Sequence, residues 1–200
     1  MMSAQLVQFP ASIFVPLGLA FFGLGTGYLI FGPQELLNFP ARDANVDLAN
    51  GVWGFWMPGF CQFVNGMLLL IGLSWFPVFK GSPLYAAGII TSVFGIHWFA
   101  MGYIRMRGGD PRPGGFMAIA FFLVSLLGFI VFLRAGDWPV WLLFIGLMAI
   151  YVADFFVSFG WGRPGSLRAM GLLHTLTGLW LMYLTFAIVL NLASGTHLPL

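Results

Sequence analysis

Long apolar stretches separated by short polar or Pro/Gly-rich segments dominate this chain. Crossing the hydrocarbon core of a bilayer takes about 20 apolar residues, so the pattern predicts six spanning segments. Their expected bounds are about 12–32, 51–76, 83–105, 114–133, 138–160 and 167–192. Continuous apolar segments of this length lack the two-residue alternation of a membrane β-barrel. The predicted fold class is therefore an all-α, polytopic membrane protein with six transmembrane helices.

The connections between the predicted spans contain residues that end helices or resist burial. Gly32-Pro33 is expected to end the first span. After it, residues 33–50 form the only long polar linker, which is expected to lie partly on the membrane surface, and its charged residues are Glu35, Arg42, Asp43 and Asp47. Nothing in the pattern indicates a second domain, so residues 1–200 are predicted to form a single six-helix transmembrane domain.

Composition excludes several other classes of protein. The chain is 60% hydrophobic and 7% charged, whereas ordinary globular domains carry about 25% charge. A disordered segment, a nucleic-acid-binding domain and a secreted disulfide scaffold are all excluded, and the single Cys61 has no internal partner. There is no Gly-rich phosphate loop, zinc-binding His-Glu-x-x-His or nucleophile elbow. We therefore expect that the protein is not an enzyme and that it has no cofactor, metal site or nucleic-acid partner.

The eight cationic side chains all fall between the predicted spans, and their distribution predicts an orientation. Six lie in connections at one end: Arg42, Arg105, Arg107, Arg112, Arg163 and Arg168. Only Lys80 and Arg134 lie at the other end. Because positive residues favour the cytoplasmic side, we expect a multi-pass protein of the cell (inner) membrane with both termini outside.

One charged residue and two histidines lie inside predicted spans. At about 1.5 Å per residue, His97, Asp154 and His174 are all roughly 9 to 12 Å from the predicted cytoplasmic face. Histidine changes charge near neutral pH, so the three residues could form a pH gate or proton relay. Alternatively, Asp154 and His174 hold two spans together as an interhelical pair, and a packing role is favoured for His97 beside Trp98. Both interpretations remain open.

Two further interpretations concern a ligand. His97 and His174 on separate helices could be the axial ligands of a haem in a membrane anchor subunit. The uncharged groups of Gln62, Thr91 and Ser92 instead suit a small polar solute. No fixed cation is expected along the pore, so an anion would cross as its neutral acid, because desolvating a bare carboxylate is prohibitive.

Several segments resemble the acetate uptake transporter family, the acetate/succinate permeases. PLGLAFFGLGT at 16–26 resembles the opening signature of that family, and 58–66 looks like its Gly-Gly-x-x-Gln-x-x-x-Gly segment. The stretch from Lys80 to Trp98 is similar to its Lys-Gly-Asn…Thr-Ser-Tyr-Gly-x-x-Trp segment. This resemblance implies a hexamer of six-helix protomers, each with its own pore, passing acetate and in some members succinate, often linked to protons. On it, Phe22 and Phe94 are the pore constrictions, and Trp98 is a further residue of the pore.

A second resemblance points to the acid-gated urea channel and amide transporter family. The stretch 94–116 resembles the region from the third to the fourth span of that family, and Gly136-Asp137-Trp138 resembles its entry to the fifth span. Its outward termini agree with the charge distribution above. The prediction is therefore a channel or transporter for a small monocarboxylate such as acetate, with a urea or short-chain amide channel, or a haem-binding anchor subunit, as alternatives.

Overall fold

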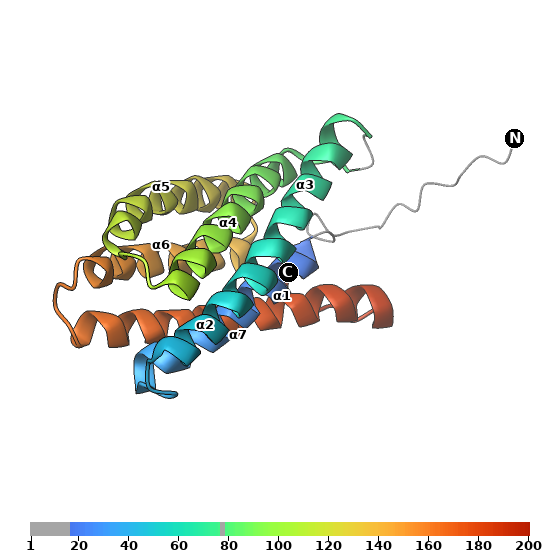
Figure 1. The fold of residues 1–200 in the computed structure, drawn as a ribbon. Helices are drawn as coiled ribbons and strands as arrows, with labels where there is room; N and C mark the ends of the chain where they lie inside the picture. The colour runs from blue at the N-terminus through green and yellow to red at the C-terminus, as the bar shows by residue number, and fades with distance from the viewer. Residues whose placement is uncertain (1–16, 77–78) are drawn as a thin grey trace, which may run out of the picture.

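The computed structural model describes residues 17–76 and 79–200, and its regular structure is entirely helical (Figure 1). The helices are α1 (Gly18–Leu37), α2 (Ala44–Gly54), the π-helix η2 (Phe55–Phe60), α3 (Cys61–Ser74), α4 (Ser82–Arg107), α5 (Arg112–Arg134), α6 (Trp138–Ser158) and α7 (Gly165–Ser194). Because α2, η2 and α3 follow one another without a break, the described chain forms six continuous helices. The all-α prediction is confirmed.

Five of these helices are long and apolar enough to cross a membrane. They are 44–74, 82–107, 112–134, 138–158 and 165–194, so the last four predicted spans agree with observed helices to within two residues. The second helix begins seven residues before its predicted span, 51–76. The predicted first span began near residue 12, and residues 12–16 lie outside the described part of the chain. Within the described residues, α1 does not reach the same apolar length, because its last turn carries Gln34 and Glu35.

The long polar linker predicted after the first span is wrong. Helix α1 continues through Pro33 to Leu37, and α2 begins at Ala44, so only residues 38–43 connect them. Asn38 ends α1 in the left-handed conformation (φ 53°), and the Asp43 carboxylate caps α2 by accepting the N–H groups of Asn45 and Val46. Proline removes one helical hydrogen bond, but a helix packed against others tolerates that loss.

Small residues bring the helices close enough to pack in pairs. α1 packs most extensively on α7, α3 on α4, and α5 on α6. On the α1–α7 seam, a Cβ atom built on Gly171 would lie 2.7 Å from the Gly32 carbonyl oxygen. On the α3–α4 seam, a Cβ atom on Gly95 would lie 2.5 Å from the Phe63 nitrogen. These seams fix the helix positions because backbones in contact cannot slide without a clash.

The π-helix η2 interrupts the helix 44–74 at Pro58. A proline ring crowds the carbonyl one turn back and supplies no N–H, and widening the turn is one way for a helix to pass it. Buried Pro58 packs where α1 passes, and a Cβ on Gly27 would lie 2.8 Å from its Cγ atom. The wide turn therefore lets the helix 44–74 pack on α1 where this helix crosses the bundle in Figure 1.

Candidate functional site

A cavity of about 210 Å³ lies at the end of the bundle where α1, α4 and α6 finish and α5 and α7 begin. Its lining residues recur every three or four positions along each helix, which identifies the inward face. The lining from α1, α4 and α6 includes Tyr28, Phe31, Gln34, Glu35, Asn38, His97, Trp98, Met101, Ile104, Arg105, Ile150, Tyr151, Asp154, Val157 and Ser158. Residues 108–111 of the α4–α5 connection line its outer part, so the cavity is continuous with the end of the protomer that the charge distribution predicts to be cytoplasmic.

His97, Asp154 and His174, which the sequence places at one depth, all line this one cavity. Asp154 and His174 do not form the direct interhelical pair that was one of the two alternatives for them. His174 Nδ1 lies 2.7 Å from Glu35 Oε2, and Asp154 instead accepts a hydrogen bond of 3.0 Å from the Ser158 hydroxyl on its own helix. The His174 ring also stacks on Tyr28, with ring centroids 4.7 Å apart. The pair that joins two helices is therefore Glu35–His174, between α1 and α7.

Glu35 is a site residue that the sequence analysis missed. The sequence predicts a surface position for it, because proline usually ends a helix and Glu35 follows Pro33. The structure buries it, with 8% of its surface exposed, in the last turn of α1. A signal was present, because Tyr28, Phe31, Glu35 and Asn38 follow one another at helical spacing and all line the cavity.

Aromatic side chains close the inner end of the cavity, which we call the floor and define as Tyr28, His97, Trp98 and Tyr151. All are buried. Predicted constriction residue Phe94 lies one turn of α4 beyond His97 and does not itself line the cavity. Its ring is 2% exposed and lies 5.8 Å from that of Tyr151. The structure thus places Phe94 directly behind the floor.

Phe22, the other predicted constriction, lies elsewhere. Its side chain is 44% exposed on the outside of the protomer and takes no part in the cavity lining. The inward face of α1 is formed instead by residues at helical spacing that include Phe21, Leu24 and Tyr28. A helix turns about 100° per residue, so residue 22 points away from residues on the inward face. The assignment of Phe22 as a constriction is not supported by this placement.

Of the remaining predicted pore residues, Trp98 is part of the floor, whereas Gln62, Thr91 and Ser92 lie beyond the cavity, on α3 and α4. The Thr91 and Ser92 hydroxyls donate to carbonyls of their own helix, those of Ala87 (2.8 Å) and Gly88 (2.7 Å). Gln62 Oε1 and both amide atoms of Asn65 are buried without a hydrogen-bond partner within 17–76 and 79–200, and so is Trp98 Nε1. Unpaired buried polar atoms are costly. Gln62 Oε1 and the Asn65 amide atoms are the unpaired polar atoms behind the floor, whereas Trp98 Nε1 belongs to the floor itself.

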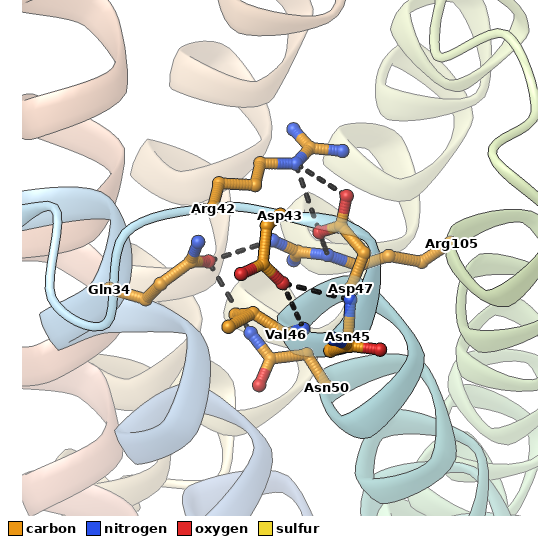
Figure 2. Close-up of polar contacts among 8 residues, drawn as sticks. All are labelled: Gln34, Arg42, Asp43, Asn45, Val46, Asp47, Asn50 and Arg105. Atoms are coloured by element: carbon orange, nitrogen blue, oxygen red, sulfur yellow. Dashed lines mark hydrogen bonds and ion pairs between the residues drawn. The ribbon is translucent and has the colours of Figure 1, made fainter.

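A cluster of charged residues lies where the cavity opens, contrary to the expectation that no fixed cation lines the pathway. Arg42, Arg105 and Arg163 all line the cavity. Figure 2 shows Arg42 and Arg105 converging on the Asp47 carboxylate, each through its Nε atom at 2.9 Å. Helix α4 extends past the predicted span end at Arg105 to Arg107. The Arg105 side chain is only 12% exposed.

The Arg105 guanidinium is held from three sides. Its Nη2 donates to Gln34 Oε1 at 2.7 Å, its Nε donates to Asp47, and the group lies 4.4 Å from the ring centroid of Phe31. Asn50 in turn donates to the same Gln34 oxygen at 3.4 Å. We call Arg42, Asp47 and Arg105 the mouth cluster. Two cations there share one carboxylate, so the cluster carries a net positive charge.

Comparisons with known proteins establish the fold. No protein-family model and no curated protein matches this chain. Among solved structures, the chain is similar to the bacterial acetate channel SatP, with a TM-score of 0.73 and 18% sequence identity over 94% of this chain and 97% of that chain. The match confirms, at the level of the fold, the resemblance to the acetate uptake transporter family. This chain therefore has the multi-pass membrane fold of that channel.

Proposed function

We propose that this protein is a channel or transporter for a small monocarboxylate such as acetate, which passes through the individual protomer. The observation that carries the proposal is the cavity at one end of the bundle, with fixed cations at its mouth, in a fold shared with an acetate channel. A cation at the entrance suits an anionic solute because charge-assisted hydrogen bonds hold carboxylates.

The solute is proposed to cross the floor as its neutral acid. Past the mouth cluster the wall becomes aromatic, and a bare carboxylate there would lose its hydration without replacement. The carboxyl and imidazole groups on the cavity wall inside the mouth cluster are Glu35 with His174, Asp154 and His97. A protonated imidazole or carboxyl can give its proton to the solute carboxylate and regain one from the water at the open end. This exchange makes transport proton-linked.

Beyond the floor, Phe94 is the proposed constriction, and Gln62 offers the next polar group. Support for this comes from burial and position, since Phe94 packs against Tyr151 of the floor and Gln62 Oε1 is an unpaired buried acceptor. Thr91 and Ser92 contribute less, because their hydroxyl protons are already donated within α4.

Flux through the purified protein tests the proposal. Proteoliposomes take up labelled acetate and labelled urea at a series of pH values, with protein-free liposomes as the control for passive diffusion of the acid. We expect protein-dependent acetate flux that rises as pH falls. Urea flux without acetate flux would instead establish the urea or amide alternative, and a Soret band in the purified protein would establish the haem alternative.

We also propose an orientation in the membrane and an oligomeric state. The charge distribution favours both termini outside, and the resemblance implies a hexamer. Cys61 is buried and is the only cysteine, so a cysteine introduced at Thr196 gives a selective label. We expect an impermeant maleimide added to whole cells to modify Thr196→Cys, and the mass of the detergent-solubilised particle to correspond to six chains. Labelling that occurs only after cell lysis would show that the C-terminus is inside, opposite to the proposed orientation.

A further inference from the structure

The mouth cluster has more hydrogen-bonding capacity than its internal contacts use. A guanidinium has five N–H donors. Arg105 uses its Nε for Asp47 and Nη2 for Gln34, and Arg42 uses only its Nε, which contacts both Asp47 oxygens at 2.9 Å. The other guanidinium N–H groups of these two arginines have no protein acceptor within the described residues. Both side chains line the cavity, so these donors are available to a molecule entering it.

The acidic groups on the same wall are already engaged. Glu35 contacts His174, Asp154 accepts from Ser158, and Asp110 is bonded by Arg112. Arg163, the third arginine on the wall, donates to the Val157 carbonyl at 3.0 Å. The cation pair of Arg42 and Arg105 therefore shares only the Asp47 carboxylate.

We propose that Arg105, together with Arg42, binds the carboxylate of the solute at the cavity mouth, and that Asp47 occupies this cation pair when no solute is bound. This inference rests on the proposed function and gives it a recognition site. Asp47 is a carboxylate itself, so its contacts with the two guanidiniums have the chemistry that a monocarboxylate would have. Its side chain is 19% exposed and stands at the start of α2, next to the connection 38–43.

The geometry supports exchange rather than permanent neutralisation. Arg105 keeps Gln34 and the Phe31 ring when Asp47 leaves, so its guanidinium stays in place for a new carboxylate. Arg42 is 56% exposed, and exposed ion pairs are weak. An entering carboxylate can therefore displace Asp47 from Arg42 first, while the Gln34 and Phe31 contacts keep the Arg105 guanidinium in place.

The test measures acetate transport in proteoliposomes at neutral pH, where the solute outside is the anion. Arg105→Gln is expected to raise the KM for acetate by about tenfold, which corresponds to one lost charge-assisted hydrogen bond. Arg105→Lys keeps the charge without the planar fork and is expected to fall between wild type and Arg105→Gln. Asp47→Asn removes the internal competitor and is expected to lower KM by about threefold.

A double variant and a matched control make the result specific. If Asp47 acts by competing for Arg105, the variant carrying both Asp47→Asn and Arg105→Gln has the KM of Arg105→Gln alone. Arg134→Gln removes an exposed arginine at the opposite end of the bundle, in the last turn of α5, that does not line the cavity, so it should leave KM unchanged. Should Arg105→Gln fail to yield monodisperse protein, Arg105→Lys and Asp47→Asn still move KM in opposite directions.

Three outcomes are decisive. Acetate flux that persists with an unchanged KM in Arg105→Gln overturns the inference and leaves the proposed function intact. A KM effect seen only in vesicles containing anionic lipid, and absent in neutral phosphatidylcholine vesicles, also overturns it, because the arginines would then bind lipid phosphate. A wild-type protein that conducts urea and no acetate shows that the proposed function itself has failed.

Discussion

The two ends of the cavity handle charge in different ways. At the mouth, guanidiniums of Arg42 and Arg105 stay charged at any working pH and contact one carboxylate. Further in, every polar group that can ionise is a carboxyl, an imidazole or a phenol, each able to become neutral. A fixed charge near water and a removable charge near the aromatic floor suit a solute that is attracted as an anion and crosses as an acid.

The two regions are also held together differently. Glu35 and His174 meet because α1 and α7 touch at the backbone, with Gly171 against Gly32. The mouth cluster depends on long side chains reaching from α2, α4 and the 38–43 connection (Figure 2). Changes to the seam should therefore disturb the fold, whereas changes at the mouth should disturb solute binding.

The largest effect is expected from a substitution that adds a side chain at the α1–α7 seam. Gly171→Ala places a methyl group against the Leu36 nitrogen and 2.7 Å from the Gly32 oxygen, both backbone atoms. Overpacking of this kind costs about 1–3 kcal/mol or more, which exceeds the gain of about 1 kcal/mol in helix propensity. We expect a large loss of monodisperse protein on size-exclusion chromatography and a lower Tm for what remains.

Gly165→Ala is the matched control, because a Cβ on Gly165 meets nothing within 4 Å at the start of the same helix. It should keep or slightly raise Tm. Equal behaviour of the two variants would contradict the seam as the element that holds Glu35 to His174.

An intermediate effect is expected from removing Glu35 from the Glu35–His174 pair. Glu35→Leu leaves buried His174 Nδ1 without its partner at 2.7 Å, which costs about 1–3 kcal/mol. Asp47→Asn at the more exposed mouth should cost no more than about 1 kcal/mol. Thermal unfolding of both variants in one detergent measures the contrast, and Glu35→Gln, which can still hydrogen-bond, should fall between them. A larger loss of Tm for Asp47→Asn than for Glu35→Leu would contradict this prediction.

Asp154→Asn tests whether the inner carboxyl exchanges protons without removing its contact to Ser158. The amide can still accept the Ser158 hydroxyl, so we expect a folded protein with little change in Tm. Asparagine has no proton to exchange at working pH, so the rise of acetate flux with falling pH should flatten. Flux against pH in proteoliposomes measures this, with Ser158→Ala as the control that removes the contact and keeps the acid. An unchanged profile returns Asp154 to a structural role.

Apolar length was enough to predict most of the fold. Spans near 83–105, 114–133 and 138–160 correspond to α4, α5 and α6 because each is apolar throughout and bounded by Gly, Pro or charge. Counting residues from the span ends also placed His97, Asp154 and His174 at one depth, and all three line one cavity. Depth along a helix follows from sequence position alone, so this part of the site was accessible.

What the sequence left hidden is which way each side chain faces and how helices far apart in the chain meet. Phe22 and Phe21 are neighbours of the same type, and only the packing of α1 shows that Phe21 is inside and Phe22 outside. Glu35 was hidden because a proline usually ends a helix, and α1 continues past Pro33 under tertiary packing. Its partner His174 is 139 residues away, and no local pattern predicts such a contact.

The smallest effect on transport is expected from an acid at the opposite end of α6, which lies outside the cavity. Asp137 caps α6 by accepting the Val140 N–H at 3.1 Å, and burial raises the pKa of its carboxyl to about 6. The folded protein therefore holds this proton up to about pH 6, whereas the unfolded chain releases it near pH 4. The stability contributed by this group accordingly falls as pH rises from about 4 to 6 and is level above that.

Asp137→Asn keeps an oxygen that can cap the helix and removes the titration. Relative to wild type, we expect no gain at pH 4 and a gain of about 1–2 kcal/mol above pH 6, read as a higher Tm in detergent. Asp110→Asn is the control, because hydrogen bonds from Arg112 lower the pKa of the Asp110 carboxyl to about 2, so it stays ionised across this window. A Tm gain that grows with pH for Asp137→Asn and not for Asp110→Asn, with acetate flux unchanged in Asp137→Asn, separates this structural acid from the acids that line the cavity.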